Sequence, residues 1–258
     1  MASIKVKNDG PASPRKRAAN GAGAASMKAK PAAGEADKPP AKPKARTTGK
    51  GRPLTRIQRE KQDIILEAAL DVFSVYGFRG STIDQIAEVA GMSKPNLLYY
   101  FPRKEDIHRR LISELLVTWL EPLRDIDADG DPIPEIRSYI RRKIEMARDF
   151  PRESRLFANE MLQGAPHIID MIEVDLKNLV DEKAKVLEGW MDTGKIARTD
   201  PYHLIFSIWA TTQHYADFDV QVRAVLGRDR GGEGRFEDAA RYLEQLFMTG
   251  VLMPKKRA

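Results

Sequence analysis

Apolar side chains recur at helical spacing along most of the chain after about residue 55. In the first such stretch Ile65, Ala68, Val72 and Phe73 follow the i, i+3, i+4, i+7 rule and share one face of a helix. Glycine or proline stands where most of these stripes stop, as expected at helix ends. The pattern predicts helices over about residues 55–76, 82–90, 94–100, 104–124, 133–150, 156–163, 166–193, 201–218 and 236–250. No stretch alternates as a strand does, so the predicted fold class is all-α.

Residues 82–100 hold two short apolar stripes separated by a tight turn. Gly91 follows the first stripe, as expected where a helix ends in a left-handed turn. Ser93 can then accept from the free N–H groups of a second helix, and Pro95 fits near that helix's start. Helix, three-residue turn and helix follow at the spacing of a DNA-reading helix-turn-helix, with an ordinary helical hairpin as the alternative.

The second of these helices would carry the side chains that meet DNA. Lys94 and Asn96 lie at its N-terminal end, where base edges are reached. Tyr99 and Tyr100 lie at its end, and their hydroxyls are able to reach phosphates. Ser93, at the turn before the helix, is a further candidate DNA contact. These five residues are therefore candidate DNA contacts.

Positive charge is concentrated at the same end of the chain. The net charge is +6, yet residues 1–62 hold 16 basic and 4 acidic side chains, whereas the other 196 residues hold 27 and 33. Residues 1–50, rich in Ala, Lys and Pro, are predicted to be a disordered basic tail. Arg52 and Arg56, just before and at the start of the first helix, are placed to touch phosphates or a minor groove.

Several classes of protein are disfavoured by composition. Cysteine is absent, which excludes disulfides and thiolate metal sites. The four histidines form no metal-ligand pattern, and there is no Gly-rich phosphate loop or nucleophile setting, so we expect neither an enzyme nor a cofactor. No apolar run is long enough to cross a bilayer, and the first residues lack a secretory signal. We therefore expect a cytoplasmic protein with no membrane partner.

Polar residues interrupt the apolar stripes of the second half of the chain. Arg137, Glu160 and Gln213 each lie one turn or so from apolar neighbours. They either satisfy one another and helix ends or project into a cavity that receives a polar ligand. The helix at 201–218 also has an apolar surface too wide for one neighbour, so a second subunit could cover part of it. That surface comprises Leu204, Ile205, Ile208, Trp209, Thr212 and Tyr215.

The string LYYFPRKE at residues 98–105, after the helix-turn-helix, resembles the DNA-binding domain of TetR-family regulators. The resemblance implies a helix-turn-helix domain over 51–102, a helical ligand-binding and dimerisation domain over 103–258, and a homodimer on palindromic operator DNA. It also implies that Thr82 and Lys104 hold phosphates. Arg103 departs from the family pattern because Ser or Asn would cap the next helix there, a loss of about 1 kcal/mol.

Residues 154–166, 175–183 and 203–225 resemble the ligand domain of the pyrimidine-utilisation repressors of this family, which respond to uracil and thymine. The resemblance implies that Trp119, Arg137, Trp209 and Gln213 occupy positions of the pyrimidine pocket, with Lys at the Arg137 position in that group. A Gln amide can match the edge of uracil, and Trp faces provide a stacking surface. His214 and Tyr215 adjoin Gln213 and could contribute, or be core or interface residues.

The expected function is therefore a ligand-responsive repressor of nucleobase metabolism, released from its operator by uracil or thymine. The signal would pass through the helix at 104–124. Two alternatives remain, namely a regulator with another effector, such as a purine or an amino-acid-like metabolite, and an architectural DNA-binding protein that takes no ligand.

Overall fold

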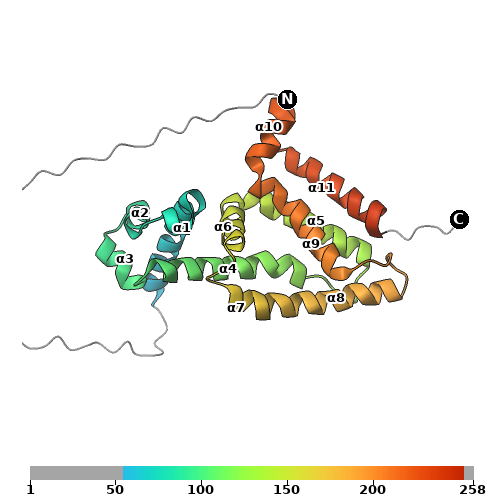
Figure 1. Ribbon diagram of the computed structural model, residues 1–258, viewed down its shortest axis with the longest axis horizontal. Coiled ribbons are helices and arrows are strands. Elements are labelled where there is room, and N and C mark those ends of the chain that lie inside the picture. Colours follow the sequence, from blue (N-terminus) through green and yellow to red (C-terminus); the bar gives the residue numbers. More distant parts are fainter. Residues whose placement is uncertain (1–54, 253–258) are drawn as a thin grey trace, which may run out of the picture. The chain divides into compact units, whose positions relative to one another are not determined.

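The computed structural model describes residues 55–252 as a series of helices, and no strand occurs in that range, in agreement with the predicted all-α class (Figure 1). Arg52 and the predicted tail at residues 1–50 lie outside the described residues. The helices are α1 (Arg56–Gly80), α2 (Ile83–Val89), α3 (Lys94–Tyr100), α4 (Lys104–Arg124), α5 (Pro132–Asp149), α6 (Pro151–Leu162), α7 (Ile169–Met171), η1 (Ile172–Leu176), α8 (Lys177–Asp192), α9 (Pro201–Asp217), α10 (Asp219–Arg230), α11 (Arg235–Gln245) and η2 (Leu246–Leu252).

Helices α1–α3 form one group, which we call the head. Capping boxes start α1 at Thr55 and α2 at Thr82, and Gly91 turns the chain between α2 and α3 with φ 63°. The three helices are joined by fully buried side chains, one or more from each of them. These are Ile65, Ala69, Phe73, Ile86 and Leu97. The predicted helix-turn-helix is thus present, and its core comes from the stripes visible in the sequence.

Helix α4 connects the head to the remaining helices, which we call the body (α5–α11). It contacts α1 near its start and α5, α6 and α8 further on (Figure 1). Pro122 lies two residues before its last residue, Arg124, and the helix is not continued beyond. One uninterrupted helix thus spans both groups.

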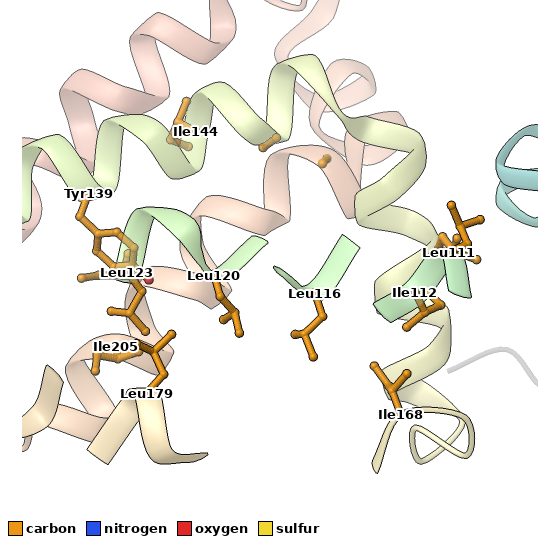
Figure 2. Packing of buried hydrophobic residues seen from close by; sticks show 14 of the residues in the cluster. Leu111, Ile112, Leu116, Leu120, Leu123, Tyr139, Ile144, Ile168, Leu179 and Ile205 are labelled. Carbon is orange, nitrogen blue, oxygen red and sulfur yellow. The ribbon is translucent and has the colours of Figure 1, made fainter. Parts of the chain in front are cut away.

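The centre of the body is made by α4, α5, α8 and α9. Helix α5 packs most extensively on α9 and carries α11 on another side. Figure 2 shows the buried side chains Leu116, Leu120 and Leu123 of α4 with Tyr139 of α5, Leu179 of α8 and Ile205 of α9. Of these side chains, Ile205 belongs to the wide apolar surface predicted for residues 201–218.

Parts of the predicted helix pattern differ from the structure, including the start of α6 at Pro151 and not at about residue 156. The helix predicted over 166–193 begins only at Ile169, after a turn in which Gly164 and Ala165 adopt positive φ, and it runs to Asp192 through the π-helical segment η1 between α7 and α8. Residues 219–230 form α10, which the apolar pattern did not reveal. That helix has no buried residue, and it bends at Gly227, where φ is 72°.

Within residues 55–252 none of the helices is both long and apolar enough to cross a membrane.

Candidate functional site

Helix α3 presents a polar surface and is fixed from behind by one buried leucine. Leu97 is fully buried, whereas Lys94 and Asn96 are exposed. Tyr99 is 69% exposed, and its ring meets that of the half-buried Tyr100 edge-on with centroids 5.1 Å apart. The side chains expected to meet base edges and phosphates therefore face outward from a rigid support.

Ion pairs or a helix cap involve three of the predicted DNA contacts in the head. Lys94 Nζ lies 2.9 Å from Asp84 Oδ2 on α2. The Thr82 hydroxyl accepts from the Gln85 main-chain N–H at 3.2 Å and remains exposed. Arg56 is exposed and pairs with Glu60 at 2.7 Å. The predicted cap at Ser93 is wrong, because its side chain makes no capping hydrogen bond at the start of α3. These placements leave the predicted DNA contacts accessible, and their roles stay predictions.

Lys104 has a structural role that the sequence did not indicate. Its ammonium donates to the carbonyls of Phe78 and Ser81, both at 2.7 Å, and lies 4.4 Å from the centre of the Phe78 ring. A cation is favourable beside the unpaired carbonyls at the end of α1. Two of its three protons are therefore used to attach the start of α4 to the head, and the predicted phosphate contact is limited to the third.

An indole and an ammonium lie together in the interior, between α4 and α5. Trp119 of α4 is 6% exposed, and its Nε1 is buried with no partner among the described residues. Lys143 of α5 is 3% exposed, and its Nζ lies 5.1 Å from the centre of the Trp119 ring. Burial lowers the pKa of Lys143 to about 7, opposed by the charge of Asp217. We call Trp119 and Lys143 the interior pair.

Helix α9 supplies the neighbouring polar groups. The indole N–H of Trp209 donates to the hydroxyl of Tyr139 at 2.5 Å, one turn before Lys143 on α5. Gln213, one turn after Trp209, and Asp217, one turn later again, line a hollow of about 410 Å³ between α6 and α9. We call this space the Gln213 hollow; the charge of Asp217, one of its lining residues, acts on Lys143.

His214 and Tyr215 belong to a different hollow. They line a space of about 390 Å³ together with residues of α10 and α11, such as Leu226 and Tyr242. His214 also stacks on Phe218 with ring centroids 5.0 Å apart. These two predicted ligand contacts are therefore separated from Gln213, although they adjoin it in sequence.

Arg137 requires a correction. Its side chain is 55% exposed and its Nε lies 3.8 Å from Glu244 Oε2 of α11, so it faces α11 and not Trp119. The cation beside Trp119 is Lys143, six residues later. Sequence reasoning missed it because the cation of the pocket was assigned to Arg137. The available signal was its position, since Lys143 is seven residues after Ile136 and three after Ile140 on the apolar stripe.

Glu160 also lies elsewhere than predicted. It is buried near the head, where its carboxylate accepts from the main-chain N–H of His167 at 2.8 Å and meets His167 Nδ1 at 3.1 Å. Of the alternatives for this residue, local satisfaction is the one the structure favours over a place in the ligand cavity.

A helix-turn-helix head joined by one long helix to an all-α body with an interior polar group is the architecture of a DNA-binding regulator that senses a small molecule. Residues 65–111 match the family model described as bacterial regulatory proteins, tetR family, and residues 112–254 match that described as YcdC-like protein, C-terminal region. The chain belongs to the TetR family of transcription regulators. It is accordingly a DNA-binding regulator and not an enzyme.

Individual relatives agree with this assignment. The HTH-type transcriptional regulator RutR of Escherichia coli (strain K12) is 47% identical over 206 residues, which cover 80% of this chain and 96% of the relative. Among solved structures, the ketosteroid transcriptional regulator KstR2 of Mycobacterium tuberculosis has a TM-score of 0.61 at 21% identity, covering 75% of this chain and 96% of its own. The structure of AibR in complex with isovaleryl coenzyme A and operator DNA has a TM-score of 0.59 at 19% identity, and the match covers 72% of this chain and 97% of that one. At these identities the structures establish the fold alone.

Proposed function

We propose that this chain is a repressor that binds its operator as a homodimer and leaves it when uracil or thymine enters the body beside the interior pair. One observation carries the proposal. The Trp119 indole N–H is a buried donor with no acceptor among the described residues, and the Lys143 ammonium lies beside its ring. Buried donors are rarely left unpaired, so an absent acceptor is implied.

The donors match the edge chemistry of a pyrimidine base. Uracil and thymine are flat rings with two carbonyl acceptors and ring N–H donors. Lys143 and Trp119 would donate to a carbonyl, and the Gln213 amide could pair with an adjacent N–H and carbonyl. The Trp209 N–H is already bonded to Tyr139, so Trp209 would contribute its ring face. The resemblance of residues 203–225 to pyrimidine-utilisation repressors supports the same effector class.

The surface of α9 supports the homodimer. Its inner face is buried, whereas Tyr202 and Phe206 are 39% and 47% exposed on the opposite face. Apolar side chains that stay exposed on one helix are typical of a subunit interface. Two heads related by a two-fold axis would then reach two half-sites of a palindromic operator.

The effector is tested by calorimetry on the full chain with uracil, thymine and adenine. We expect uracil or thymine to bind, and to reduce affinity for a DNA fragment that the protein itself selects from a random pool. The Lys143→Met variant should bind uracil about 30-fold more weakly, while the matched Arg137→Met variant should retain the affinity of the unmodified chain. Failure of both pyrimidines to bind, or binding that leaves DNA affinity unchanged, contradicts the proposal. Binding of adenine instead would identify a purine-responsive regulator.

A further inference from the structure

Two histidines and a glutamate converge where the head meets the body. His108 lies on α4, Glu160 on α6, and His167 in the loop after α6. One ring nitrogen from each histidine and one carboxylate oxygen all lie within 4.8 Å of one another. We call these three residues the junction cluster. None of them lines the Gln213 hollow, and the separation of His108 from the other two in sequence hides the arrangement from motif analysis.

The contacts within the cluster leave His108 without a hydrogen bond. Glu160 accepts from the main chain and the ring of His167. By contrast, His108 Nε2 lies 3.8 Å from Glu160 Oε2, beyond hydrogen-bonding distance, and His108 Nδ1 is buried with no partner among the described residues. The His108 side chain is nearly inaccessible to solvent. The centre of its ring lies 5.0 Å from that of Phe73 and 4.8 Å from that of Phe78. The nitrogen that faces Glu160, Nε2, is thus without a hydrogen bond in a buried setting, which implies a missing partner there.

The distances suit a metal ion as that partner. Ligand bonds of about 2.0–2.1 Å at tetrahedral angles put neighbouring ligand atoms about 3.3 Å apart. The cluster's Glu160–His167 and Glu160–His108 separations, 3.1 and 3.8 Å, lie on either side of that value. Two imidazoles and a carboxylate form a donor set used for Zn²⁺ and related ions, with water in a remaining position.

We propose that His108, Glu160 and His167 form a binding site for a divalent first-row transition metal, with Zn²⁺ as the first ion to test. Glu160 and the two neutral imidazoles would each supply one ligand atom, and His167 would carry its ring proton on Nε2. The ion would tie α4 to α6 and its following loop, directly against Phe78 at the end of α1 and beside the Lys104 contact. It would therefore stiffen the junction that positions the head.

The test uses the full chain without an affinity tag, stripped of metal by a chelator and then titrated with Co²⁺. We expect one Co²⁺ per chain, with the visible absorption of a low-coordinate nitrogen and oxygen site, displacement of that signal by Zn²⁺, and a higher Tm with Zn²⁺. His167→Gln at the edge of the cluster and Glu160→Gln should each weaken Co²⁺ binding by about tenfold or more. His203→Gln on the exposed side of α9 is the matched control and should bind as the unmodified chain does.

Circular dichroism establishes that each variant is folded, and His167→Gln alone decides the test if Glu160→Gln does not fold. An unmodified chain that gives no Co²⁺ spectrum overturns the proposal. Unchanged affinity in His167→Gln also overturns it, as does an equal loss in His203→Gln, because the metal would then bind at surface histidines.

Discussion

Replacing Lys143 with methionine should make the ligand-free protein more stable and its binding of uracil weaker. Burial lowers the pKa of Lys143 from 10.5 to about 7. Between pH 7 and 10.5 the Lys143 side chain is protonated in the unfolded chain but largely neutral in the folded one. The free energy of unfolding therefore rises with pH over this range. Below pH 7 the folded protein bears the full cost of the buried charge. That cost is of order 5 kcal/mol at about 1.4 kcal/mol per pKa unit. Methionine has similar length and no charge, so we expect a gain of about 2 kcal/mol or more at pH 7.

The same substitution removes the donor assigned to the effector. A hydrogen bond from a charged group contributes about 1.5–3 kcal/mol. A loss of about 2 kcal/mol corresponds to about 30-fold weaker uracil binding. The two effects have opposite signs, which separates a loss of function at the site from a loss of fold.

Urea unfolding at pH 7 and pH 9 measures the first effect, and calorimetry with uracil measures the second. Protein concentration is held constant, because dimer stability depends on it. Raising the pH from 7 to 9 should stabilise the unmodified chain by about 2 kcal/mol more than Lys143→Met. Asp217 is the charged neighbour of Lys143 and is present in both proteins, so its own titration largely cancels in this difference.

Arg137→Met is the matched control, since it removes a cation from the exposed face of the same helix. It should change stability by less than about 0.5 kcal/mol and leave uracil affinity unaltered. The reasoning is refuted if Lys143→Met is less stable than the unmodified chain and binds uracil equally well. It is also refuted if the stability of the variant and that of the unmodified chain depend on pH in the same way.

Further predictions concern the head and the dimer. Asn96→Ala should change the unfolding free energy by less than about 0.5 kcal/mol. Fluorescence anisotropy should show that it weakens binding of the selected DNA by about 1–3 kcal/mol. An equal loss of affinity for scrambled DNA would show that Asn96 does not read bases. Lys104→Met should lower the unfolding free energy by about 1–3 kcal/mol, because the carbonyls of Phe78 and Ser81 lose their donor; unchanged stability with weaker DNA binding would indicate a phosphate contact alone. Phe206→Glu should shift sedimentation toward the monomer while Val75→Glu, on the exposed side of α1, should not; a dimer in both would place the interface elsewhere.

The head could be predicted from sequence because its determinants are local. The Thr82 cap, the Gly91 turn and the apolar positions Ile86 and Leu97 each lie within a few residues of the element they define. The same local rules explain why α10 was missed. Val220 and Val225 are exposed and no residue of that helix is buried, so it has no apolar stripe to detect.

The interior sites could not be predicted in the same way, because they depend on which face of a helix meets which neighbour. Periodicity places Arg137 and Lys143 on different faces of α5, yet only the packed positions of α4 and α11 decide that Lys143 meets Trp119 and Arg137 meets Glu244. The junction cluster is a stronger case, since α4 and the α6 loop are brought together by tertiary packing alone.

Helix α4 explains how an event in the body could reach the head. Lys104 attaches its first residue to the end of α1, and Trp119, 15 residues later, belongs to the interior pair. At 1.5 Å per residue these positions are about 22 Å apart on one rigid element. The other polar connection, from Arg152 of α6 to Glu67 and Asp71 of α1, consists of partly exposed ion pairs. Such pairs contribute about 0–1 kcal/mol each and rearrange readily. We expect a displacement at Trp119 to reach the head through α4, although α6 also packs directly on α1.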